Sequence, residues 1–197
     1  MTLENEHARL EPMGEEHAAG LLEAGLEPEM WAYLPTTRPQ TLEQMLGYIR
    51  GCLALREAGT EMPFVIVAPR TGRVAGSTRL MDIRAAHRGV EIGWTWVGAA
   101  WRRTGVNTSC KYLLLRHVFE DLAGVRVQLK CDERNARSRA AIERIGGRYE
   151  GTLRSTMVLP DGHRRNTTYY SIIETEWPGA GGVKERLEGM LRRGVPA

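Results

Sequence analysis

The sequence predicts one α+β domain in which helices flank a central mixed, mostly antiparallel sheet. Three strand-like segments follow one another with short turns between them, which is typical of an antiparallel meander. A helical segment then leads to a further strand-like segment, and such a strand–helix–strand unit requires a crossover that pairs its two strands in parallel. The length of 197 residues suits a single domain.

The N-terminal part of the chain predicts a strand followed by two helices. Residues 7–12 alternate in polarity and predict a strand, and 13–25 predict a helix that stops at Gly25. Residues 31–39 contain two prolines and three Trp, Tyr or Leu anchors, so we expect a structured loop. Residues 41–59 begin with a threonine cap and predict a second helix. Its apolar stripe comprises Leu42, Met45, Leu46, Ile49 and Leu53.

The periodicity then changes from helical to alternating. The strands of the meander are predicted at 63–69, 73–83 and 89–97, with turns at "RTG" and "AHRG". The next helix shows apolar residues at helical spacing from Cys110 onward. Asn107 and Thr108 are both suitable N-cap residues for it. Its apolar face comprises Leu114, Val118 and Leu122 on one line, with Leu115 and Phe119 beside them.

The C-terminal part predicts a strand, a helix, two further strands and a tail helix. Asn135 is expected to cap the first of these helices, a Gly-Gly pair to end it, and "PDG" to form the turn between the last two strands. The predicted ranges are 124–132, 135–146, 148–159, 163–175 and 183–193. We therefore expect a domain at 1–178 and, at 179–197, a flexible linker with a surface helix.

Composition and charge are those of an ordinary soluble globular protein. Hydrophobic residues make up 42% and charged residues 26%. No apolar run approaches the roughly 18 residues of a membrane span, and residues 1–20 lack the order of a signal peptide, so we expect a cytoplasmic protein. A net charge of +3 is too small to indicate nucleic acid, although the arginines of 134–148 leave an RNA-binding face as an alternative. The three cysteines are widely separated, which favours buried thiols over a disulfide framework or a zinc site.

The segment in front of the central helix is suited to an anion. Arg102 and Arg103 precede Gly105, and glycine lets the backbone approach a ligand closely. Free N–H groups at a helix N-terminus attract negative charge. The segment 101–107 also lies beyond the carboxyl end of a central strand, where open sheets place their ligand crevices. A plain helix cap with solvated arginines is the alternative.

The familiar phosphate-binding and catalytic motifs are absent from the sequence. It contains no Gly-x-x-x-x-Gly-Lys-Ser/Thr, no Gly-x-Gly-x-x-Gly after an early strand, no His-Glu-x-x-His and no Gly-x-Ser-x-Gly. The five histidines have no ligand spacing, so no metal is expected. An anion at this loop would therefore belong to another kind of molecule.

The loop and its helix resemble motif A of the GNAT acetyltransferases, in which a Gln/Arg-x-x-Gly-x-Gly/Ala loop holds the pyrophosphate of acetyl-CoA. Here the motif reads "RRTGVN" from Arg102, with Asn107 in place of the last small residue. The segment "NARS" from Asn135 resembles the family's second cofactor motif, Asn-x-x-Ser/Ala. The segment "IERIGGRYEGTLR" is similar to the branch that includes ribosomal-protein alanine N-acetyltransferases. The resemblance covers roughly residues 6–178.

The resemblance implies acetyl-CoA as acyl donor and a set of residues that hold it. Pantetheine would lie along the backbone of residues 94–97 and contact the "NARS" motif, and the diphosphate would meet the N–H groups of residues 103–108 and the arginines. The implied set comprises Trp96, Val97, Arg102, Arg103, Thr104, Gly105, Val106, Asn107, Thr108, Asn135, Ser138 and Arg139.

The resemblance also implies proton-transfer residues. Glu91 matches a strand glutamate that often acts as a base through water, and a structural carboxylate paired with an arginine is the alternative. Many family members carry a tyrosine that acts as general acid, and the corresponding position here is Ile142. Tyr169, Tyr170 and Ser171 on the last strand are the remaining candidates, and we select Tyr170; a core or cross-strand role is the alternative.

Together these features predict an N-acetyltransferase that moves acetyl from acetyl-CoA to a primary amine by direct attack in a ternary complex. The acceptor would be a protein N-terminal amine or a small-molecule amine, with the loop 31–39 shaping that side of the cleft. A non-catalytic CoA-binding sensor of the same fold is the alternative, favoured by Ile142 and Asn107. No membrane or nucleic-acid partner is expected, and the resemblance allows a homodimer.

Overall fold

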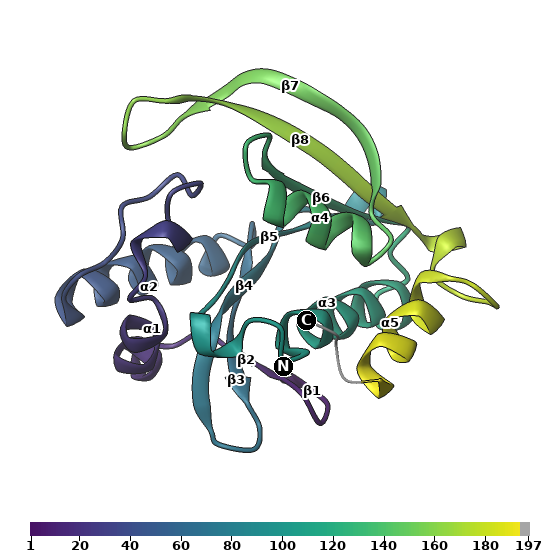
Figure 1. The fold of residues 1–197 in the computed structure, drawn as a ribbon, viewed down its shortest axis with the longest axis horizontal. Coiled ribbons are helices and arrows are strands. Elements are labelled where there is room, and N and C mark those ends of the chain that lie inside the picture. Colours follow the sequence, from purple (N-terminus) through teal and green to yellow (C-terminus); the bar gives the residue numbers. More distant parts are fainter. Residues whose placement is uncertain (194–197) are drawn as a thin grey trace.

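The computed structural model describes residues 1–193, which form one eight-stranded sheet with five α-helices against it (Figure 1). The strands are β1 (Leu3–Glu4), β2 (Arg9–Pro12), β3 (Met62–Ala68), β4 (Arg73–Arg84), β5 (Gly89–Val97), β6 (Arg126–Asp132), β7 (Arg148–Val158) and β8 (Arg164–Ile173). The α-helices are α1 (Ala18–Ala24), α2 (Leu42–Glu57), α3 (Val106–Arg116), α4 (Ala136–Arg144) and α5 (Val183–Arg192). Short 3₁₀ turns lie at Glu15–His17, Pro28–Met30, Ala85–His87, Ala99–Trp101 and Glu174–Glu176, and a π-helical turn, His117–Asp121, follows α3.

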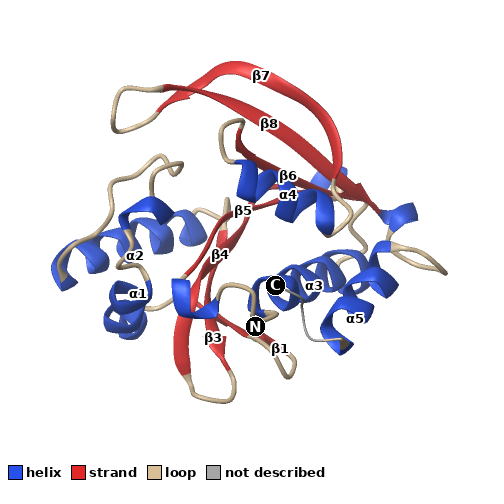
Figure 2. Ribbon diagram, in the orientation of Figure 1, coloured by secondary structure: helices blue, strands red, loops and turns tan. Residues whose placement is uncertain are grey.

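The sheet has the order β1-β2-β3-β4-β5-β6-β8-β7 and contains one parallel pair among the described residues, β5 with β6. The meander β3-β4-β5 and the crossover through α3 confirm the predicted α+β fold. In Figure 2 the sheet opens in its middle, with β1 to β5 on one side of the opening and β6 to β8 on the other.

The opening arises because β5 and β6 pair along only three residues. Their register ends at Glu91 opposite Gln128. Beyond this point β5 stays paired with β4 as far as Val97, and β6 stays paired with β8 as far as Asp132. The facing edges of the two central strands are therefore unpaired where a ligand backbone could lie between them.

Two hydrophobic cores hold helices on opposite faces of this sheet. On one face, α1 and α2 pack on inward residues such as Val65, Val67 and Trp96. On the other face, α3, α4 and α5 pack on residues such as Ile66 and Val127. Figure 1 shows the two helix layers on either side of the central strands. No helix among residues 1–193 is long and apolar enough to cross a membrane.

The structure corrects the predicted start and end of the central helix. The helix α3 begins at Val106, so Asn107 and Thr108 lie in its first turn and are not its N-cap. Gly105 takes that position because its left-handed backbone, with φ of 88°, turns the chain directly into the helix. Leu122 lies after the helical segment and is exposed, so it is not part of the apolar face.

Other differences concern the margins of elements. Leu42 is exposed because it is the first residue of α2, where the apolar stripe has not yet reached the core. The two-residue strand β1 was not predicted, since it is too short to show a period. The predicted surface helix at 183–193 packs against α3, with Leu187 fully buried in the core. The last four residues of the predicted segment 179–197 lie outside the described part of the chain.

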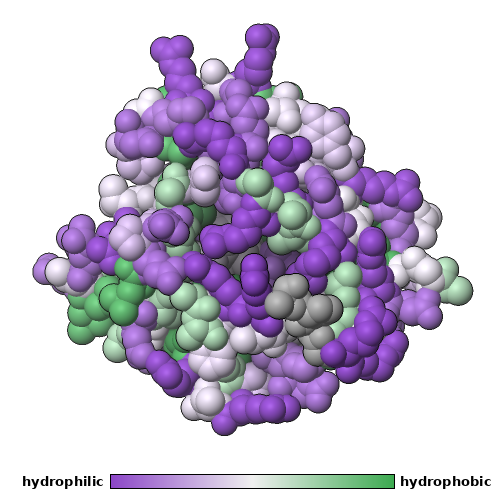
Figure 3. All heavy atoms as spheres, in the orientation of Figure 1, coloured by the Kyte–Doolittle hydropathy of each residue, from purple (hydrophilic) through white to green (hydrophobic). Residues whose placement is uncertain are grey.

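The predicted cysteine and turn chemistry is confirmed. Cys52, Cys110 and Cys131 are all buried free thiols. The turn between β7 and β8 contains Gly162 with φ of 81°, and Asp161 accepts a hydrogen bond from the backbone N–H of His163. The surface seen in Figure 3 is mostly hydrophilic, with hydrophobic residues in small separate patches.

Candidate active site

The loop between β5 and α3 presents an uncapped helix N-terminus. Arg103 and Gly105 both have left-handed backbone conformations, with φ of 61° and 88°. No side chain among the described residues caps α3. By contrast, Thr41 caps α2 and Asn135 caps α4 through their side-chain oxygens. The first N–H groups of α3 are therefore available to an anion.

In the loop between β5 and α3, the side chains of Arg102 and Thr104 bind partners that are not part of α3. Arg102 pairs with Glu27, which follows α1, at 2.6 Å. The Thr104 hydroxyl donates to the carbonyl of Trp101 at 2.7 Å. Arg103 is exposed and has no ion-pair partner among residues 1–193. Of the two loop arginines, Arg103 thus keeps its charge free for a ligand.

The end of β5 places Trp96 and Val97 at the opening of the sheet. Both residues pair with β4 through Ser77 and Gly76. The Trp96 ring is buried on the α2 face, 5.2 Å from the Trp31 ring, so this residue offers a ligand only its backbone.

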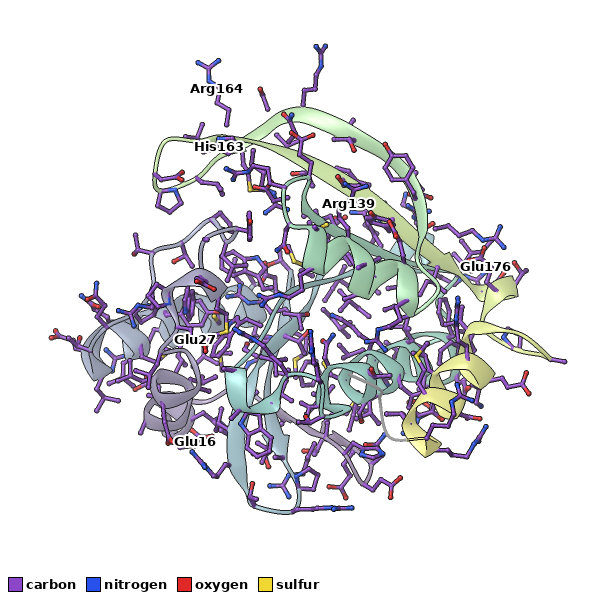
Figure 4. The ribbon with its side chains drawn as sticks, viewed as in Figure 1. Glu16, Glu27, Arg139, His163, Arg164 and Glu176 are labelled. Carbon is purple, nitrogen blue, oxygen red and sulfur yellow. The ribbon has the colours of Figure 1, made fainter. Side chains whose placement is uncertain are left out.

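The start of α4 brings Asn135 and Ser138 together but sends Arg139 elsewhere. The Asn135 side-chain oxygen accepts from the Ser138 backbone N–H at 3.0 Å, so the asparagine is the helix cap and keeps only its amide N–H₂ for a ligand. Arg139 lies beside β8 and β7, where its Nε donates to the Tyr170 hydroxyl at 3.4 Å (Figure 4). The structure does not bring Arg139 to the anion loop.

Arg144 occupies the place that the sequence analysis gave to Arg139. Its Nη2 donates to the Thr108 hydroxyl in the first turn of α3 at 3.1 Å. Arg144 is partly buried, has no carboxylate partner among the described residues, and burial lowers the pKa of its guanidinium. Sequence reasoning missed this residue because the arginine-rich segment offers no pattern that distinguishes one arginine from another.

Glu91 lies on the α1–α2 face of β5, opposite its neighbours Val90 and Ile92, which belong to the other core. Its Oε2 accepts from the side-chain nitrogens of Gln128, at 2.8 Å, and Lys130, at 3.1 Å. Its Oε1 is buried and has no partner among the described residues. The carboxylate is therefore held on one oxygen by β6, while its other oxygen is a buried acceptor without a hydrogen-bond donor in residues 1–193.

Tyr170 lies on the opposite face of the sheet from Glu91. Gln128, which bonds Glu91, faces Ser171 on β8, and adjacent residues of a strand point to opposite faces. The Tyr170 hydroxyl donates to Glu143 at 3.0 Å, and burial raises the pKa of its phenol. Ile142, at the position where a tyrosine was sought, is buried in the core.

On the face of Glu91, the loop after α1 closes over the sheet. Arg165 on β8 is buried and donates to the Tyr33 carbonyl at 3.1 Å, which ties the loop to the last hairpin. A cavity of about 480 Å³ lies between this loop and α2. Its lining comprises Thr36, Thr37, Arg38, Pro39, Gln40, Gln44 and Tyr48.

The chain matches known acetyltransferases in sequence and in structure. The family profile described as "Acetyltransferase (GNAT) domain" matches residues 7–148. A solved structure from T. thermophilus, described as a "putative acetyltransferase", is 36% identical, with a TM-score of 0.86 and coverage of 96% of each chain. RimJ of Mycobacterium smegmatis in complex with CoA-disulfide shares the fold at 23% identity, with a TM-score of 0.80 and coverage of 98% of this chain and 94% of RimJ.

A curated relative carries a more specific name. "Putative ribosomal N-acetyltransferase YdaF" of Bacillus subtilis (strain 168) is 32% identical over 108 residues. The match spans 55% of this chain and 58% of that relative's length.

Proposed function

The chain belongs to the GNAT acetyltransferase family, and from this premise we propose that it transfers acetyl from acetyl-CoA to a primary amine by direct attack in a ternary complex. The observation that carries the proposal is the opening between β5 and β6, with an uncapped helix N-terminus on one face and the free Glu91 oxygen on the other. Such an arrangement lets the donor and the acceptor reach one point from opposite sides.

The residues on the α3 face suit acetyl-CoA as a substrate. We propose that the N–H groups from Arg103 to Thr108 bind its diphosphate, with charge from Arg103 and Arg144. The free edge of β5 at Trp96 and Val97 offers backbone groups to the pantetheine arm, as do the side chains of Asn135 and Ser138. Arg102 contributes through its position in the loop. Arg139 has no place in this set, because its contacts lie toward the β7–β8 hairpin.

In the proposed reaction, the acceptor enters as the neutral amine after its ammonium form has lost one proton to solvent. Glu91 takes the second proton, which the nitrogen loses during the attack, directly or through a water. The amine nitrogen bonds to the thioester carbonyl carbon, and a backbone N–H of β5 holds the oxygen of the tetrahedral intermediate. The carbon–sulfur bond breaks next, and the thiolate leaves with a proton from an acid on the α3 face. We propose Tyr170 as that acid; its hydroxyl must give up the bond to Glu143 to act.

Direct attack is favoured over an acyl-cysteine intermediate. Cys110 and Cys131 are buried, and burial raises the pKa of both thiols, which disfavours the nucleophilic thiolate. Neither thiol has a histidine as hydrogen-bond partner among the described residues, so neither has a base to activate it.

We propose a protein N-terminal amine as the acceptor, with a small-molecule amine as the second class. The support comes from the ribosomal N-acetyltransferase name of the B. subtilis relative and from the loop 31–39, whose cavity presents hydroxyl, amide and guanidinium groups suited to peptide backbone. A ribosomal-protein acceptor would place the reaction in the cytoplasm.

The first experiment is calorimetric titration of the protein with acetyl-CoA, beside the same titration of Gly105→Val. We expect micromolar binding, about −8 kcal/mol, and its loss in the variant, since a β-branched residue cannot take the left-handed entry to α3 without strain. No binding by the natural protein would contradict the proposal.

The second experiment separates an enzyme from a CoA-binding sensor. Peptides with N-terminal alanine or serine are offered with acetyl-CoA beside spermidine and an aminoglycoside, and acetylation is read by mass spectrometry. Modification of the peptides alone supports the protein-acceptor proposal. Binding without any acetylation would favour the sensor, for which the absence of a tyrosine at Ile142 is the supporting observation.

A further inference from the structure

Lys111 is a buried cation that the proposed reaction does not use. It lies in the second turn of α3, and its side chain points into the sheet side of the helix with only 7% of the residue exposed. Its Nζ donates to the Thr95 hydroxyl at 2.6 Å, and no carboxylate lies within ion-pair distance in residues 1–193. Burial lowers the pKa of its ammonium. A lysine with three donors and no counter-charge is unusual in a protein core.

The partner of Lys111 belongs to the irregular part of β5. Trp94 and Thr95 together face the single residue Thr78 of β4, and Trp94 has a left-handed backbone with φ of 49°. Such a bulge bends a strand and reorients its backbone groups. The Thr95 hydroxyl also donates to the Gly93 carbonyl at 3.4 Å and shares a hydrogen bond of 2.8 Å with the Thr78 hydroxyl. Lys111 therefore fixes a hydrogen-bond chain that spans Trp94.

A second cation holds the same bulge from the other face. The guanidinium of Arg79 stacks over the Trp94 ring at 4.3 Å and pairs with Glu61 at 2.8 Å. Arg79 thus has a counter-charge, whereas Lys111 has none among the described residues. The bulge begins three residues beyond Glu91, at the free edge where β5 leaves β6.

We propose that Lys111 is a positioning residue for acyl transfer. Through Thr95 it orients the backbone of the bulge, and it places positive charge behind the N–H groups that receive the donor's carbonyl oxygen. The inference rests on the proposed function, since the carbonyl is that of acetyl-CoA. Charge aimed at a developing oxyanion is effective in a buried site, because the protein has already oriented it and little solvent screens it.

Stability does not explain the presence of this lysine. Burying a charge without a counter-charge is costly, and replacing such a group with an apolar side chain of similar shape is often neutral or stabilising. A purely structural residue at this position would be served as well by methionine, which has a similar length and suits a helix. Because an unpaired buried lysine lowers the stability of the fold, its presence is better explained by a role in function.

The test compares Lys111→Met with Lys111→Arg, Thr95→Val and the control Tyr112→Phe. The control removes one hydrogen bond of the same helix, from the Tyr112 hydroxyl to Glu188, away from the bulge. Lys111→Met and Thr95→Val are expected to lower kcat by about tenfold or more while the Kd for CoA and the thermal midpoint stay near those of the natural protein. Lys111→Arg should recover part of the rate, and the control should retain all of it.

A second measurement is independent of the acceptor. Infrared difference spectra of bound acetyl-CoA, labelled with ¹³C at the thioester carbonyl, report the polarisation of that bond. We expect a lower carbonyl frequency in the natural protein than in Lys111→Met. A frequency shift without transfer to any amine would leave the Lys111 assignment standing and reject the proposed function. Equal frequencies in both proteins, or a rate loss in Lys111→Met that parallels a fall in thermal midpoint, would overturn the assignment.

Discussion

Glu91 keeps one carboxylate oxygen without a partner while β6 holds the other, and this asymmetry predicts the effect of its substitution. Glu91→Gln keeps the shape and the ability to accept from Gln128 but removes the proton acceptor. Because general base catalysis contributes about 10²- to 10⁴-fold, kcat/KM should fall by about 100-fold or more. The Kd for CoA, which we propose to bind from the other face, should change little.

Steady-state kinetics with a peptide acceptor that has a free N-terminal amine, and calorimetry with CoA, check this result together. Tyr170→Phe is the comparison variant, and a smaller loss is expected for it because its hydroxyl already donates to Glu143. Full activity in Glu91→Gln would show that the Glu91 carboxylate is not the base and serves only as the ion-pair partner of Lys130.

At the scale of elements, the N-cap residues of α2 and α4 have the same structural role and can be compared by substitution. Thr41 and Asn135 each accept a hydrogen bond from the backbone of their helix, but only Asn135 stands beside the opening of the sheet. Thr41→Ala and Asn135→Ala should each lower the free energy of unfolding by about 1 kcal/mol. Only Asn135→Ala should also weaken CoA binding, because its amide group is lost from the proposed pantetheine site.

Urea unfolding of the two variants measures the free energy of unfolding, and calorimetry measures their affinity for CoA. Equal loss of CoA affinity in both proteins would indicate that Asn135 acts on the ligand only through stability.

Periodicity predicted most elements well, because the period of the apolar residues reports which face is buried. The strand β5 was predicted at its observed bounds, and α2 within two residues of them. The start of α3 could not be predicted from capping rules, since a helix whose N-terminus is left for a ligand carries no capping side chain. The bulge at Trp94 was also missed, because it depends on contacts from α3 and β4 that are distant in sequence.

The site residues that could be identified from the sequence lie next to one another in motifs, whereas the others stand alone in longer segments. The loop arginines and Gly105 are adjacent and form a motif, so the sequence was sufficient to select them. Lys111 did carry a signal, because it is spaced by four from Leu115 and by seven from Val118, on the buried side of α3. A charged residue in an apolar stripe is readily taken for an interruption when nothing shows what lies against it.

At the scale of the whole molecule, several carboxylates make stability depend on pH. Hydrogen bonds from His17, Lys184 and Arg126 hold the pKa values of Glu11, Glu120 and Glu150 below their usual 4.5. A carboxylate with a lowered folded-state pKa contributes stability above its unfolded pKa and loses it as pH falls through the folded value. The free energy of unfolding should therefore decline below about pH 4.5.

Urea unfolding at about pH 6 and at about pH 3.5, at constant ionic strength, measures this decline. Glu150→Gln should unfold with a smaller difference between the two conditions, because it removes one of the contributing groups. An equal difference in the variant would show that the Glu150 carboxylate is unperturbed in the folded protein.

The short pairing of β5 with β6 has a mechanical consequence. Within residues 1–193, the strand pairing between the five-stranded and three-stranded parts of the sheet covers three residues of each strand and ends at Glu91 and Gln128. A donor whose amide groups form hydrogen bonds to the free edges of both β5 and β6 would extend the connection between the two parts of the sheet. The amide protons on the facing edges of β5 and β6 should then exchange slowly with deuterium only when the donor is bound. The acyl donor would in this way stabilise the part of the sheet at which it reacts.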